Sequence, residues 1–122
     1  MSYEIAITDN NGRHAYIPRD NYTSNVGPMF YACIPAGNGG RYDVHGRQTE
    51  YTTGIPGLSG LPTERVAELL GQGIAAMVER ADEMQALNPP NGYGNYDAAL
   101  EWLCGLKDAC EQNPGHTFWA NW

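Results

Sequence analysis

Two segments of the chain combine asparagine and tyrosine in a way that could bind a ligand. The first is Asn21-Tyr22-Thr23-Ser24-Asn25, and the second, from Asn88 to Tyr96, reads Asn-Pro-Pro-Asn-Gly-Tyr-Gly-Asn-Tyr. Asparagine amides and the free N–H groups of a helix N-terminus are fixed hydrogen-bond donors, and tyrosine rings stack on planar groups. Capping and turn formation need the same residue types, so that interpretation stays open beside a ligand site.

The positive charge of the chain is carried by six arginines and a single lysine, Lys107. A fold could gather a few of the arginines around one small anion, with tyrosines stacked on the rest of the ligand. The candidate ligand- or partner-binding residues are therefore Tyr22, Asn25, Arg41, Arg47, Asn91 and Tyr93.

No sequence motif for catalysis is present: the chain lacks the GxGxxG, phosphate-loop, HExxH, EF-hand and GxSxG patterns. His14, His45 and His116 fall in separate segments, so we predict no metal site and no cofactor. Cys104 on an apolar helix face is more typical of a small buried hydrophobe than of a nucleophile. The alternative to a binding protein is a small hydrolase or transferase that uses His45 or His116 with a carboxylate.

Length and charge restrict the class of protein. A chain of 122 residues is near the commonest domain size, which predicts one domain over residues 1–122. The net charge of -7 opposes general binding to nucleic-acid backbones and favours basic protein partners. Three cysteines without a CxxC pair, no signal peptide and no apolar run of about 20 residues predict a cytoplasmic protein that makes no membrane contact.

The pattern of apolar residues predicts an α+β fold with a small antiparallel sheet. Apolar and polar residues alternate from Tyr3 to Thr8 and from Arg13 to Ile17, and the turn residues Asp9-Asn10-Asn11-Gly12 between them predict a hairpin. The aromatic tail 116–122 is expected to dock or to add an edge strand. Residues 36–60 hold seven glycines and are expected to form a mobile loop, or a weak hairpin through Tyr42-Asp43-Val44 and Thr49-Glu50-Tyr51.

Helical periodicity predicts the elements that cover this sheet. A short helix is expected at residues 27–34, halted by Pro35, and two amphipathic helices follow at 62–87 and 96–111. The first amphipathic stripe includes Val66, Leu69, Leu70, Gly73, Ile74, Met77, Val78, Ala81 and Met84; the second comprises Ala99, Leu103, Leu106 and Cys110. Trp102, Trp119 and Trp122 fit either the core or a surface for a protein partner.

Three stretches resemble short, functionally uncharacterised phage and prophage proteins. They are the opening Met1-Ser2-Tyr3-Glu4-Ile5-Ala6-Ile7-Thr8-Asp9, the Asn21–Asn25 segment before Pro28-Met29-Phe30, and Gly57-Leu58-Ser59-Gly60 ahead of a long helix. The resemblance covers about two thirds of the chain, and the glycine-rich segment 36–54 departs from it. It implies an accessory phage protein and no catalytic residue.

The resemblance and the missing enzyme motifs together predict a stoichiometric inhibitor of host defence. In one version the chain occludes a host protein through an acidic and aromatic face. In the other it sequesters a nucleotide signal with Arg41, Arg47, Tyr22 and Tyr93. A further alternative is a structural or regulatory phage component that forms a homo-oligomer through Met77, Met84, Trp102 and Leu106.

Overall fold

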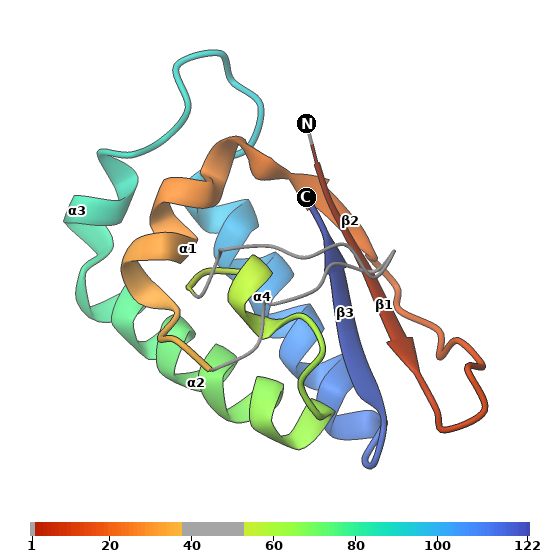
Figure 1. Ribbon diagram of the computed structural model, residues 1–122. Coiled ribbons are helices and arrows are strands. Elements are labelled where there is room, and N and C mark those ends of the chain that lie inside the picture. Colours follow the sequence, from red (N-terminus) through yellow and green to blue (C-terminus); the bar gives the residue numbers. More distant parts are fainter. Residues whose placement is uncertain (1, 38–52) are drawn as a thin grey trace.

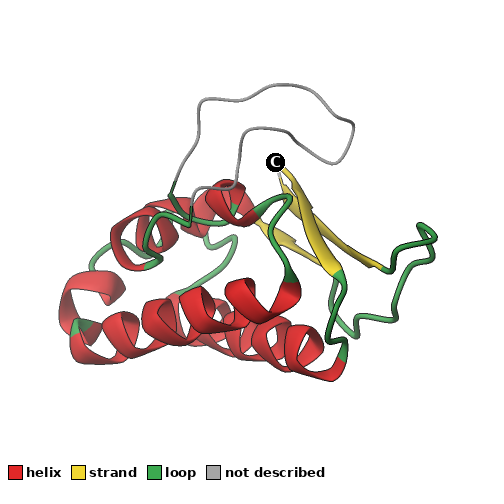
Figure 2. Ribbon diagram, turned by 60° about the horizontal axis from the view of Figure 1, so that its bottom comes forward, coloured by secondary structure: helices red, strands yellow, loops and turns green. Residues whose placement is uncertain are grey.

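A small sheet lies along one side of a group of helices (Figures 1 and 2). The computed structural model describes residues 2–37 and 53–122. Over these residues the elements are β1 (Ser2–Thr8), β2 (Asn21–Thr23), the 3₁₀ turn η1 (Ser24–Val26), α1 (Gly27–Cys33), the 3₁₀ turn η2 (Pro56–Leu58), α2 (Thr63–Glu79), α3 (Ala81–Gln85), α4 (Tyr96–Gln112) and β3 (Thr117–Asn121). The predicted α+β class is confirmed.

The sheet has three antiparallel strands in the order β2-β1-β3, so β1 is the central strand. Ile5 pairs with Ala120 and Ile7 with Phe118, and all four side chains are buried on the helix side. This alternation places residues 4, 6 and 8 on the other face, as expected for a strand of period two. The predicted edge strand at the C-terminal tail is confirmed as β3.

The second hairpin strand was predicted in the wrong place, because residues 13–17 form no regular strand. Asp9 accepts hydrogen bonds from the backbone N–H groups of Asn11 and Arg13, which tightens the turn. The returning chain then bonds to β1 only near His14 and Ala15 before Pro18, which has no N–H group to donate. The strand that pairs with β1 on this edge is β2, which forms from the asparagine- and tyrosine-rich segment.

The two amphipathic helices are confirmed as α2 and α4, which pack against each other. The predicted stripe of α4 is buried in full, and α2 buries Val66, Leu69, Leu70, Gly73 and Met77. Val78 is an exception to the predicted stripe, because its side chain is 57% exposed. No helix within residues 2–37 and 53–122 combines the length and the apolar character that crossing a bilayer requires.

The predicted helix over 62–87 is broken at Arg80, which separates α2 from α3. Arg80 has φ -106° and ψ 34°, outside the helical region. Its guanidinium donates to the carbonyl of Ala32 at 3.1 Å and to the Glu83 carboxylate at 2.9 Å. The side chain therefore connects the end of α2 to α1 at the point where the helix changes direction.

The described end of the predicted glycine-rich loop, residues 53–60, is packed into the protein. Ile55 and Leu58 of this segment are fully buried around η2. The Ser59 hydroxyl accepts from the backbone N–H of Ala120 at 3.0 Å, which fixes the segment to β3. Residues 38–52 of that loop, with Arg41, His45 and Arg47, lie outside the described residues.

Four aromatic rings join the sheet to the helices. Tyr3 of β1, Phe30 of α1 and Trp102 of α4 lie with ring centres 5.9–6.0 Å apart, and Tyr22 of β2 is 5.4 Å from Trp102. Trp102 is 2% exposed, so it belongs to the core. Trp119 and Trp122 are half-buried.

Candidate functional site

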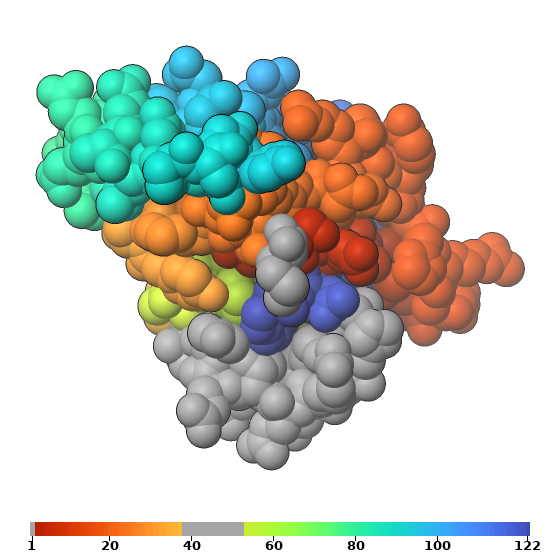
Figure 3. Space-filling view, turned by 90° about the horizontal axis from the view of Figure 1, so that it is seen from above, coloured from red at the N-terminus to blue at the C-terminus, as the bar shows by residue number. Residues whose placement is uncertain are grey.

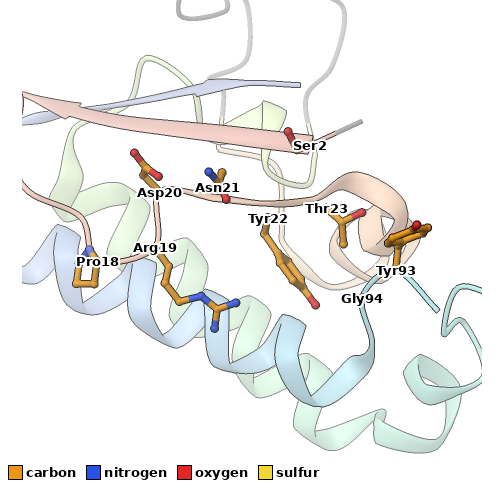
Figure 4. A pocket seen from close by; sticks show the side chains of 9 residues that line it. All are labelled: Ser2, Pro18, Arg19, Asp20, Asn21, Tyr22, Thr23, Tyr93 and Gly94. Atoms are coloured by element: carbon orange, nitrogen blue, oxygen red, sulfur yellow. The ribbon is translucent and has the colours of Figure 1, made fainter.

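The two asparagine- and tyrosine-rich segments meet at one hollow on the protein surface (Figure 4). The hollow has a volume of about 470 Å³, within the range of small-molecule sites. Figure 4 shows Arg19 and Tyr22 extending to the same side, toward α4, while Tyr93 lies at the other end of the row of lining residues. The lining residues are Ser2, Pro18, Arg19, Asp20, Asn21, Tyr22, Thr23, Tyr93 and Gly94.

Tyr22 is held in the hollow from two directions. Its ring lies against Trp102, and its hydroxyl accepts a hydrogen bond from the backbone N–H of Asn95 at 3.4 Å. Figure 3 shows the cyan connection between α3 and α4 beside the orange β2–α1 segment. The two sequence segments therefore contact each other directly, although some 70 residues separate them.

Asparagine side chains shape the loop that carries Tyr93. Asn91 accepts from the backbone N–H of Tyr93 at 3.0 Å, Asn88 accepts from Tyr96, and Asn95 caps α4 by accepting from Ala98. These bonds are the expected turn and capping chemistry. Tyr93 itself is 69% exposed, so the loop presents an aromatic ring to solvent.

Gly94 allows this loop to approach β2. Its φ is +88°, and a Cβ atom there would lie 2.6 Å from Thr23 Cγ2 and 2.9 Å from Val26 Cγ1. We expect Gly94→Ala to lower the free energy of unfolding by about 1–2 kcal/mol for the left-handed backbone and about 1–3 kcal/mol for the steric clash. Chemical denaturation would measure this loss.

Gly92 is the matched control, because its φ is +77° and a Cβ atom there would meet nothing within 4 Å. Gly92→Ala should lose only the backbone contribution. Equal losses for the two variants would show that the contact between the loop and β2 is not tight.

Arg19 lines the hollow and was not among the predicted site residues. The indole N–H of Trp102 donates to its carbonyl at 3.0 Å, and its guanidinium lies 6.0 Å from the centre of the Tyr22 ring. That distance is within reach of a cation–π contact. The signal that could have identified Arg19 is its position two residues before a segment already singled out.

The predicted site residues divide into three groups. Tyr22 and Tyr93 line the hollow. Asn25 and Asn91 are exposed but do not line it, and Asn91 instead forms the turn before Tyr93. Arg41 and Arg47 lie outside the described residues.

The residues considered for catalysis are spread over the described structure. His14 is exposed in the turn after β1, and Nδ1 of His116 lies 2.9 Å from the carbonyl of Pro114 in the connection to β3. Within residues 2–37 and 53–122, no three histidine, cysteine, aspartate or glutamate side chains gather as metal ligands would.

No protein-family model, curated protein or solved structure matches this chain.

The three cysteines differ in their surroundings, which predicts selective labelling. Cys104 is exposed, so the prediction that it is a small buried hydrophobe is wrong. Cys33 and Cys110 are buried. Burial raises the pKa of the Cys33 thiol and raises that of Cys110 to about 12. Because the thiolate is the reactive form, iodoacetamide at about pH 8 should alkylate Cys104 first, as intact mass together with peptide mapping would show.

Unfolded protein in guanidinium chloride is the control, and all three cysteines should react there. Alkylation of Cys33 or Cys110 as fast as Cys104 in the folded protein would contradict the described packing.

Proposed function

We propose that the chain is a non-enzymatic, stoichiometric binding protein that occludes a basic segment of another protein. The observation that carries the proposal is the convergence of Tyr22 and Tyr93 on one open hollow that Asp20 also lines. Exposed tyrosine rings are common anchors at protein interfaces, and they also attract guanidinium and ammonium groups. The resemblance to phage accessory proteins supports a host protein as the partner, and with it inhibition of a host defence.

Charge favours a basic partner over a phosphorylated ligand. A second hollow shares Pro18 and Arg19 with the first, and the described residues that line the two include three acids, Asp20, Glu101 and Asp108, against one base, Arg19. The chain as a whole carries a net charge of -7. An anion would meet repulsion here, whereas lysine and arginine side chains would be attracted and steered to the site.

A titration followed by NMR tests this proposal with defined probes. The ¹⁵N-labelled full chain is titrated with a peptide of alternating arginine and glycine, with its glutamate analogue, and with ATP. We expect the arginine peptide alone to shift the amide signals of residues 19–23 and 93–94. Because the attraction is electrostatic, added salt should weaken the effect.

ATP is included because the nucleotide-sequestering version makes the opposite prediction. If ATP shifts these signals and the arginine peptide does not, the site is one for nucleotides and the proposed basic partner is wrong. If neither probe shifts them, the hollow is not a binding site.

A further inference from the structure

The second hollow lies on the other side of Arg19, between the loop after β1 and the surface of α4. Its volume is about 290 Å³. Ile17 and Pro18 form one wall and Trp102 contributes to the other, so the lining is mainly apolar. The remaining lining residues are Arg19, Glu101, Cys104, Gly105 and Asp108.

A glycine in the middle of α4 leaves this hollow open. Glycine in a helix interior is about 0.5–1 kcal/mol less stable than alanine. Most described helix glycines have a neighbour that explains them: a Cβ atom at Gly73 would lie 2.8 Å from Ile34 Cγ1. At Gly105 a Cβ atom would meet nothing within 4 Å, so packing does not require glycine there. Because glycine has no side chain, the space above the α4 backbone at Gly105 stays free and forms part of the hollow.

The rim of the hollow is acidic. Glu101, Cys104, Gly105 and Asp108 follow the i, i+3, i+4, i+7 spacing of one helix face, and both acids are exposed. Neither carboxylate forms an ion pair within the described part of the chain, while the nearby Lys107 is paired with Glu111. The hollow thus combines an apolar floor with unpaired negative charge at its edge.

We infer that the hollow above Gly105 receives an apolar side chain of the partner, flanked by a lysine or arginine that contacts Glu101 or Asp108. This inference rests on the proposed function and defines the partner segment more closely. The segment has a basic residue that binds at the tyrosine hollow, and an apolar residue next to a basic one that binds at the Gly105 hollow. Charge complementarity favours this occupant. An acidic segment would be repelled by the carboxylates of the rim, and a purely apolar segment would leave them without a counter-charge.

Cys104 on the rim allows a direct test by disulfide exchange. The protein is equilibrated, under a fixed excess of thiol reductant, with symmetric cystamine derivatives in which both amines carry leucine or both carry N-succinyl-leucine. The Cys104 thiolate attacks the disulfide and releases one thiol, so the conjugated fraction reports fragment affinity. We expect the cationic leucine fragment to be captured about tenfold more than the anionic one, and the preference to fall with salt.

Gly105→Ala and Gly71→Ala form a matched pair of variants. Both add a methyl group to a helix, but a Cβ atom at Gly71 would contact only the flexible side chain of Lys107, at 3.3 Å, away from the hollow. Gly105→Ala should reduce capture of the leucine fragment about tenfold, because a methyl group fills the floor of a small apolar site. It should also leave the protein folded, since alanine favours helix.

Capture that is equal for the two fragments, or unchanged by Gly105→Ala, would overturn the inference. Tyr93→Ser separates it from the proposed function, because Tyr93 lines only the first hollow. If the Tyr93→Ser variant still captures the cationic leucine fragment selectively, the Gly105 hollow is supported, whether or not the arginine peptide binds at the tyrosine hollow.

Discussion

Replacing Trp102 with alanine is expected to lower the free energy of unfolding by about 3–5 kcal/mol. The side chain is 2% exposed and contacts the rings of Tyr3, Tyr22 and Phe30. Its loss would leave a cavity where α1, α4 and the sheet meet. Since small domains are commonly stable by only 5–15 kcal/mol, this single change should remove much of the total. Urea denaturation followed by circular dichroism would measure it.

Trp102→Phe is the companion variant. It keeps an aromatic ring in the core but removes the indole N–H that donates to the Arg19 carbonyl. We expect a smaller loss, of about 1–3 kcal/mol, from the missing hydrogen bond and the reduced volume. A loss below about 1 kcal/mol for Trp102→Ala would show that the aromatic cluster does not hold the sheet to the helices.

Reversing the charge of the three acids around the two hollows should have the largest effect on binding. The triple variant Asp20→Lys, Glu101→Lys and Asp108→Lys is expected to bind the arginine peptide at least about 100-fold more weakly, because attraction becomes repulsion at close range. All three side chains are exposed, so folding should persist. Isothermal titration calorimetry would give the affinity.

The control carries the same change in net charge on elements that line neither hollow. Glu68→Lys, Glu79→Lys and Asp82→Lys alter α2 and α3, and the exposed ion pair of Glu68 with Arg65 contributes little stability. We expect this variant to lose only a few-fold in affinity, through the general field of the protein. Equal losses in the two variants would mean that net charge, and not the site, attracts the peptide.

Local sequence patterns predicted the helices well because their signals lie within a few turns of chain. The stripe of α4 and the cap region before it follow from spacing and residue type alone. The break at Arg80 could not be predicted this way, since it depends on the carbonyl of Ala32, which belongs to a distant element. Val78 is exposed for a local reason, because it lies about 100° around α2 from the buried Met77 and so beyond the edge of the buried face.

Short polar strands and surface hollows were beyond the reach of sequence patterns. β2 is only three residues long and has no alternating apolar side chains, so its pairing with β1 depends on the whole sheet. The tyrosine segments were recognised one at a time, but their meeting is produced by the packing of Gly94 on Thr23 and Val26. At the second hollow, the one visible signal was a glycine inside an otherwise regular amphipathic pattern.

The central position of β1 has a consequence for synthesis of the protein on the ribosome. β1 leaves the exit tunnel well before β3, the strand that pairs along most of its length, has been translated. Until then Ile5 and Ile7 lack their neighbours Ala120 and Phe118, and one edge of β1 has free backbone groups. Until β3 emerges, the nascent chain thus carries an open, apolar strand, and chaperones that bind such strands would find it there.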